Sequence, residues 1–99
     1  MRFEINEKIL TLYVEGELNS YNAEGVEKEI ESTLENKEFS SLVLDFERLS
    51  YISSAGLRAL LALKKSLIAQ NKELEVHHLN PVCQEVFKVT GFNNILTVK

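Results

Sequence analysis

Residues 43–61 read VLDFERLSYISSAGLRALL, and this is the most informative stretch of the chain. Residues 41–46 (SLVLDF) form a compact run of β-branched and aromatic side chains, which predicts a buried strand ending near Phe46. A polar step follows, Tyr51-Ile52 is apolar again, and Ser53-Ser54-Ala55-Gly56 leads into an apolar helix that begins near Ser54. The stretch therefore joins a buried strand to a helix through a short polar segment.

Three further segments alternate in the manner of strands. Residues 2–6 and 9–14 are separated by Glu7-Lys8, which predicts a hairpin although its turn lacks the usual glycine. Residues 74–79 alternate again, and a last short strand is expected at Ile95–Val98.

Two more helices are predicted beside the one that begins near Ser54. One runs from about Ser20 to Leu34, with Val26, Ile30 and Leu34 stacked at helical spacing. The other has Asn80 as its N-cap, Pro81 in its first turn and Gly91 at its end. We expect Val82, Val86 and Val89 to line one face of this helix. The central helix carries the apolar residues Leu57, Leu60, Leu61, Leu67 and Ile68.

After the hairpin the order is β-α-β-α-β-α-β, which is typical of right-handed crossovers between parallel strands. We therefore predict an α/β fold with a mixed β-sheet of four to five strands and helices mainly on one face.

The composition sets limits on the function. A chain of 99 residues has the usual size of one domain (1–99), and a deep catalytic cavity would be hard to fit. Eleven basic against fifteen acidic residues give a net charge of −4, which argues against direct nucleic-acid binding. With one cysteine, no leader segment and no apolar run of membrane-spanning length, we expect a cytoplasmic protein that does not associate with membranes.

Ser54 is open to two interpretations. Serine is a favoured N-cap, so Ser54 can simply cap its helix. A helix N-terminus also accepts a phosphate well, and Arg58, one turn further on, could reach a phosphate on Ser54. Capping alone is the simpler interpretation of the local pattern.

Charge is unevenly distributed along the chain. Residues 48–72 contain five basic and no acidic residues, whereas residues 15–38 contain eight glutamates and two lysines. Such runs are usually solvated faces, but this asymmetry could steer a partner toward the serines.

Three blocks of the chain resemble the STAS domains of bacterial anti-sigma factor antagonists. The first is Leu44-Asp45-Phe46 with Tyr51-Ile52-Ser53-Ser54-Ala55-Gly56-Leu57. The second is Gly16-Glu17-Leu18-Asn19-Ser20-Tyr21-Asn22-Ala23, similar to the family's Gly-Glu-Leu-Asp loop, and the third is Asn80-Pro81 with Val86-Phe87 and Thr90-Gly91-Phe92. The blocks follow in the family's order and spacing, and the resemblance covers essentially the whole chain.

The resemblance implies a single STAS domain that acts as a phosphorylation-controlled, protein-binding switch in transcription regulation. In this partner-switching scheme, the unphosphorylated domain sequesters an anti-sigma serine kinase of the histidine-kinase ATPase fold. Phosphorylation of Ser54 releases the kinase, and a PP2C-like phosphatase restores binding. The partner-binding residues implied are Asn19, Ser20, Tyr21, Ser53, Ser54, Ala55, Gly56, Leu57 and Arg58.

Two positions depart from the family pattern. Ser53 stands where the signature has an aspartate, and Asn19 ends the loop that the family ends in aspartate. Both replacements remove a negative charge from the expected partner surface, and Ser53 becomes a second candidate for the phosphoacceptor.

No residue points to an enzyme, a metal site or a cofactor. His77 and His78 are adjacent in a predicted strand, so they should point to opposite faces, and we see no Cys, Asp or Glu near them at ligand spacing. We expect Cys83 to be a core or boundary residue, and Asp45 to order a turn.

Two alternatives to the switch stay open. The chain could be a STAS subunit of a transporter-associated or stressosome-like assembly without a phosphoswitch. A small enzyme or nucleotide-binding protein is the other, although the sequence holds no catalytic constellation. We expect a monomer.

Overall fold

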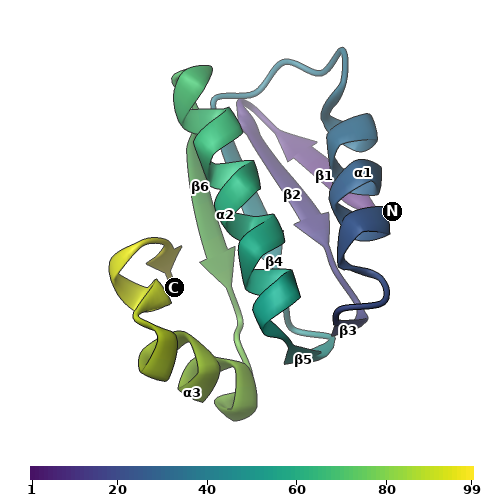
Figure 1. Ribbon diagram of the computed structural model, residues 1–99. Coiled ribbons are helices and arrows are strands. Elements are labelled where there is room, and N and C mark those ends of the chain that lie inside the picture. The colour runs from purple at the N-terminus through teal and green to yellow at the C-terminus, as the bar shows by residue number, and fades with distance from the viewer.

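A computed structural model describes all 99 residues (Figure 1). The helices are α1 (Ala23–Leu34), α2 (Ser54–Ala69), α3 (Pro81–Thr90) and a short 3₁₀ turn, η1 (Phe92–Asn94). The strands are β1 (Phe3–Asn6), β2 (Ile9–Tyr13), β3 (Gly16–Leu18), β4 (Ser41–Asp45), β5 (Leu49–Ile52), β6 (Glu73–His77) and β7 (Thr97–Val98).

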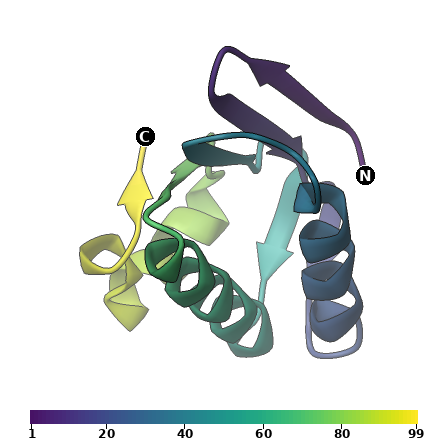
Figure 2. The ribbon, with the colours of Figure 1, turned by 90° about the horizontal axis from the view of Figure 1, so that it is seen from above.

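Five strands form the main sheet in the order β1-β2-β4-β6-β7. Only β1 is antiparallel to its neighbour, and the other pairs are parallel, as crossover connections require. Helices α1 and α2 lie side by side over one face of this sheet, while α3 lies across one end (Figures 1 and 2). The predicted α/β fold, with a mixed sheet and helices on one face, is confirmed.

The remaining strands, β3 and β5, form a separate two-stranded parallel sheet that the sequence did not reveal. Each is only three or four residues long, too short to show a period. The hairpin between β1 and β2 is confirmed, and Glu7 takes the left-handed backbone (φ 59°) that a glycine would normally supply.

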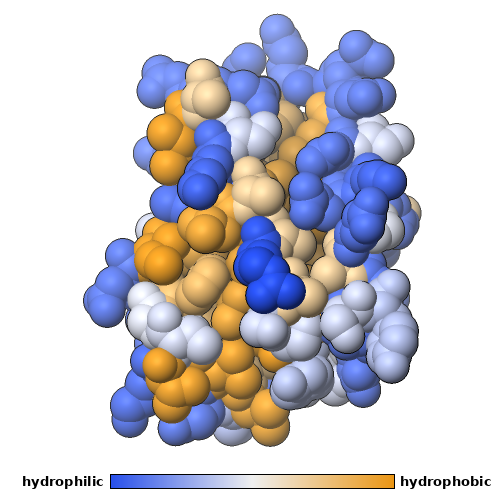
Figure 3. Space-filling view, in the orientation of Figure 1, coloured by the Kyte–Doolittle hydropathy of each residue, from blue (hydrophilic) through white to orange (hydrophobic).

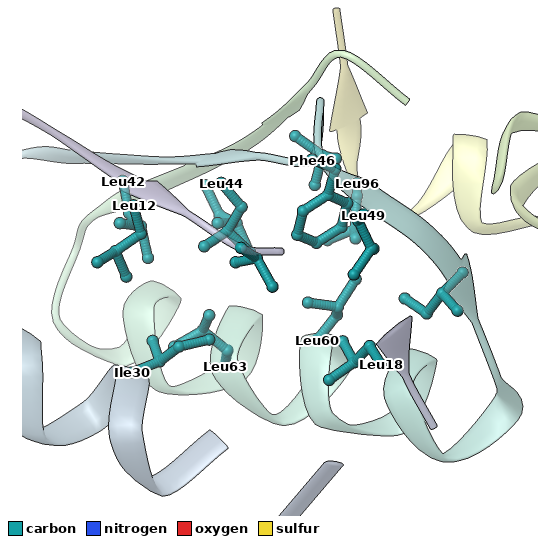
Figure 4. Close-up of a cluster of buried hydrophobic side chains, with 14 of the residues drawn as sticks. Leu12, Leu18, Ile30, Leu42, Leu44, Phe46, Leu49, Leu60, Leu63 and Leu96 are labelled. Atoms are coloured by element: carbon teal, nitrogen blue, oxygen red, sulfur yellow. The ribbon is translucent and has the colours of Figure 1, made fainter. Parts of the chain in front are cut away.

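One hydrophobic core of 22 residues joins both sheets to the helices. Parallel register sets Leu12, Leu44 and Val76 side by side across the main sheet, all fully buried. Strand residues such as Leu12 and Leu44 face Ile30 of α1 and Leu63 of α2 (Figure 4). The predicted core face of α1 is confirmed, since Ile30 is buried and Val26 packs against the core.

The predicted core faces of the other two helices need correction. In α2 the buried leucines are those at 57, 60, 63 and 67, whereas Ile68 is 59% exposed. In α3 the core face consists of Cys83 and Phe87. Val82 and Val89, expected in the core, are 53% and 70% exposed.

The ends of α3 form as the sequence predicts. The Asn80 side chain accepts a hydrogen bond from the amide of Cys83 (2.7 Å), and Gly91 ends the helix with a left-handed backbone (φ 79°). Cys83 is fully buried, which confirms its place in the core and raises the pKa of its thiol. None of the helices has both the length and the apolar character that crossing a membrane requires.

Candidate partner-binding site

The pairing of β3 with β5 brings the two candidate loops together. Leu18 pairs with Ile52 at the carboxyl ends of the two parallel strands, and the amide of Ser53 donates to the Leu18 carbonyl at 2.8 Å. The chain then leaves β3 through Asn19 and leaves β5 through Ser53, at the same end of the small sheet. Residues 19–21 and 53–55, predicted from separate motifs, therefore lie side by side, and Arg58 is exposed one turn further along α2.

Ser53, rather than Ser54, caps helix α2. The Ser53 hydroxyl accepts a hydrogen bond from the amide of Gly56 at 3.2 Å, and its backbone is extended (φ −95°, ψ 174°). Its amide continues the hydrogen bonding of β5, which keeps Ser53 out of the helix. The prediction of Ser54 as the cap is therefore wrong by one residue.

Ser54 is the first residue of α2 and lies exposed at its N-terminus. Its hydroxyl has no hydrogen-bond partner within the chain, and the amides of Ser54 and Ala55 also stay free. These unpaired amides and the helix dipole make the position favourable for an anion. Arg58 is exposed one turn further on and forms no ion pair with an acidic side chain.

Gly56 and Leu57 are buried, so they hold the first turn of α2 in place rather than offering side chains to a partner. A Cβ atom on Gly56 would lie 2.8 Å from Ile52 Cγ1, 2.9 Å from Leu18 Cγ and 3.0 Å from the Leu18 carbonyl oxygen. Only glycine lets the helix approach β3 and β5 this closely. The small sheet and the first turn of α2 are thus one packed unit.

Reciprocal hydrogen bonds fix the loop after β3. The Asn19 side chain accepts from the amides of Tyr21 (2.9 Å) and Asn22 (3.1 Å), while the Asn22 side chain accepts from the Asn19 amide at 2.8 Å. These bonds hold residues 19–22 in a turn, so α1 begins at Ala23 and not near Ser20 as predicted. Tyr21 projects from this turn with 97% of its surface exposed. Asn19 therefore orders the loop that displays Tyr21.

Asp45 orders the loop after β4, as predicted, and it does so with a histidine. Its carboxylate accepts from the amide of Glu47 and pairs with His78 Nδ1, both at 3.0 Å. His78 lies beyond the end of β6 with a left-handed backbone (φ 64°), and His77 pairs with Glu75 at 2.9 Å. The expectation that no Asp or Glu lies near them at ligand spacing is therefore wrong. Asp45 reaches His78 because parallel register sets the ends of β4 and β6 next to each other, and Glu75 lies two residues before His77 in β6.

The carboxylates of Asp45 and Glu47 and the His78 ring place their potential ligand atoms within 4.8 Å of one another. Both Asp45 oxygens already take part in hydrogen bonds within the chain. The arrangement is accounted for by loop ordering.

The largest recess of the surface, about 870 Å³, lies between α3 and residues 93–98 and contains none of the predicted site residues. The residues around Ser54 instead form an exposed end of the molecule. Such a surface suits a protein partner better than a small substrate, which usually binds in a concave site.

Comparison with known proteins shows the family. A family model for the STAS domain matches residues 1–99. BtrV of Bordetella bronchiseptica, named as a candidate anti-sigma factor antagonist, is 41% identical over 90 residues, which cover 91% of this chain and 77% of BtrV. The anti-sigma-B factor antagonist of Listeria monocytogenes is 30% identical over 90 residues, which cover 91% of this chain and 78% of the relative.

Among solved structures, a candidate anti-sigma factor antagonist of Thermotoga maritima superposes with a TM-score of 0.88 at 21% identity, covering 98% of this chain and 83% of that one. It supports the fold alone. The relatives are binding regulators, so the prediction that the chain is not an enzyme is confirmed. On the match over its full length and the identity to these relatives, the chain belongs to the STAS domain family.

Proposed function

We propose that this chain is an anti-sigma factor antagonist that binds an anti-sigma serine kinase, and that phosphorylation of Ser54 ends the binding. The relatives named for this role support the general function. The observation that carries the finer proposal is the free, exposed hydroxyl of Ser54 at the head of α2, beside the loop that displays Tyr21.

Ser54 suits the role of phosphoacceptor better than Ser53. The Ser53 hydroxyl is partly buried and engaged in the cap of α2, whereas the Ser54 hydroxyl is exposed and free. A kinase can reach Ser54 without opening the helix. Ser53 remains the second candidate because it is the neighbouring hydroxyl.

Phosphate on Ser54 changes the surface and leaves the fold intact. The modification adds about −1.5 to −2 charges at pH 7. Within the chain, the free amides of Ser54 and Ala55 lie at the helix N-terminus, and Arg58 lies one turn away, so the charge is tolerated. In an interface formed around a neutral hydroxyl the same charge must lose its water, and a penalty of even ~3 kcal/mol weakens binding more than a hundredfold.

The test uses a serine kinase of the histidine-kinase ATPase fold, the class of partner proposed here. The purified chain is incubated with this kinase and ATP, and mass spectrometry locates the phosphate. We expect it on Ser54. Ser54→Ala should bind the kinase and accept no phosphate, while Ser54→Asp should bind at least tenfold more weakly in calorimetry.

Ser32→Ala, an exposed serine of α1, is the matched control and should behave as the wild type. Phosphate at another position with Ser54→Ala unaffected would refute the assignment. Absence of both binding and phosphorylation would instead favour a STAS subunit that serves an assembly without a switch.

The remaining parts of the proposal follow from the role. A PP2C-like phosphatase restores the unphosphorylated form, and the protein works as a monomer in the cytoplasm. A phosphatase of this class should remove the phosphate from Ser54 in vitro and restore kinase binding.

A further inference from the structure

Helix α3 exposes an apolar flank of three valines, Val82, Val86 and Val89. They follow at i, i+4 and i+7, so they share one side of the helix. Val82 and Val89 are 53% and 70% exposed, and Val86 is partly buried against the core. On the opposite flank, Pro81, Gln84, Glu85 and Lys88 line the recess that α3 forms with the C-terminal segment. The valine flank therefore faces away from that segment, and Val82 and Val89 are more than half exposed.

This flank belongs to the end of the molecule where Ser54 lies. The Asn80 side chain, which caps α3, donates to the carbonyls of Leu49 (3.0 Å) and Ser50 (3.2 Å) in β5. Strand β5 runs directly into Ser53 and the first turn of α2, with Tyr51 exposed on the way. Apolar surface gathers over α3 at the lower end of the view in Figure 3, where α2 begins. The valine flank and the residues around Ser54 are thus held in a fixed relation by one strand.

The residues around Ser54 are too few for a specific interface by themselves. Such interfaces take about 20–30 residues a side, and the predicted set comprises residues 19–21 and 53–58, of which Gly56 and Leu57 are buried. The partner must therefore contact adjoining surface. The α1 side is strongly acidic, whereas the α3 side offers the aliphatic and aromatic groups that form the centres of interfaces.

We propose that the partner that binds around Ser54 also packs an apolar element against Val82, Val86 and Val89. This inference rests on the proposed function and adds a second contact region to it. The two regions differ in character: contact at Ser54 is sensitive to phosphate, and contact at the valine flank is not. Burial of apolar area on the flank contributes to the affinity for the partner. The phosphorylation state of Ser54 controls whether the complex forms.

The test measures the affinity of the full chain for the kinase that phosphorylates Ser54, using variants of exposed residues. Val82→Glu and Val89→Glu place a charge on the flank and should each weaken binding on the order of tenfold or more. Ile68→Glu is the matched control, because Ile68 is equally exposed but lies near the far end of α2, and it should bind as the wild type. Circular dichroism melts confirm that each variant is folded. If a glutamate variant fails to fold, the Val82→Ala/Val89→Ala double variant replaces it, with a several-fold loss expected.

The outcomes separate this inference from the proposed function. Wild-type affinity in the valine variants, together with weak binding of Ser54→Asp, would overturn the inference and leave the proposed function standing. If the wild-type chain neither binds the kinase nor accepts phosphate, both the inference and the proposed function are refuted. Sedimentation gives a third outcome: a wild-type dimer that Val89→Glu dissociates, with kinase affinity unchanged, would assign the flank to a second copy of this chain and overturn the inference.

Discussion

Ser53 and Ser54 are adjacent serines with different roles. Ser53 donates its amide to Leu18 and accepts from Gly56, so it joins the end of β5 to the start of α2. Ser54 has no such bonds and faces solvent. The hydroxyl that supports the helix and the hydroxyl available for modification are therefore separate groups, so modification of Ser54 leaves the cap in place.

Removal of the Ser53 hydroxyl, which caps α2, should lower stability much more than removal of the Ser54 hydroxyl. Ser53→Ala loses the bond to the Gly56 amide, which costs about 1 kcal/mol and lowers Tm by ~4–8 °C in a domain of this size. Ser54→Ala should shift Tm by less than half that amount. Thermal unfolding followed by circular dichroism measures both, and equal shifts would contradict the assignment of Ser53 as the cap.

Replacing two helical glycines by alanine should change the free energy of unfolding in opposite directions. Gly56→Ala brings a Cβ to within 2.8–3.0 Å of Ile52 and Leu18, and such overpacking costs about 1–3 kcal/mol. In Gly25→Ala the Cβ meets nothing within 4 Å, so helix propensity should raise the free energy of unfolding by up to ~1 kcal/mol. Urea denaturation gives both values, and stabilisation by Gly56→Ala would refute the close approach of α2 to β3.

The sequence predicts which residues lie in the candidate site better than it predicts what each of these residues does. The serine pair, the Asn19 loop and Arg58 are recognisable from motifs. Which serine caps the helix depends on a hydrogen bond from Ser53 to Leu18, a residue in another strand, and no local pattern contains that information. The same holds for Asp45 and His78, whose pairing follows from the register of β4 and β6.

At the scale of elements, α3 shows why periodicity alone can select the wrong face. The helix carries two apolar rows, the valines on one flank and Cys83 with Phe87 on the next. Either row satisfies helical spacing, and the larger Phe87 together with packing against β5 decides which is buried. The caps of α3 were predictable because Asn80, Pro81 and Gly91 act locally.

Strand β6 carries a carboxylate whose ionisation should link stability to pH. A hydrogen bond from His77 holds the pKa of Glu75 below its usual range, with help from Lys99 and against the opposing effect of burial. Because the folded chain binds this proton less readily than the unfolded chain, the stability contributed by Glu75 is present above about pH 4.3, where an unfolded glutamate titrates. It is lost as the pH falls through the lower folded value.

Glu75→Gln removes this titration. The wild type should therefore lose more stability than the variant as the pH falls from about 6 to about 3. Urea denaturation midpoints across this range measure the difference. Parallel pH profiles for the two proteins would contradict the role of the Glu75–His77 pair.

For the whole molecule, the order of helices and strands in the main sheet was predictable from alternation along the chain. The small sheet of β3 and β5 was not, because both strands are very short and their pairing joins segments that lie far apart in the sequence. The main sheet and the two loops of the candidate site were therefore predictable, whereas the strand pairing that brings the two loops together was not.

The C-terminal segment is part of the common core. Leu96 is 2% exposed and belongs to the core cluster, and Lys99 donates its amide to Val76 of β6. Leu96→Ala should therefore cost about 2–5 kcal/mol, whereas the exposed Ile95→Ala should cost under ~1 kcal/mol. Both are measured by urea denaturation, and a small effect at Leu96 would mean that β7 folds apart from the rest.

The pairing of β3 with β5 has a consequence for the fate of the protein in the cell. The two halves of the site meet only when these strands pair, so the unfolded chain has no binding surface. By mass action, a partner present at a hundred times its Kd raises the free energy of unfolding by about 2.7 kcal/mol. A bound chain thus opens to proteases far less often than a free one. Under the proposed switch, phosphorylation of Ser54 would therefore shorten the lifetime of the protein as well as end its contact with the partner.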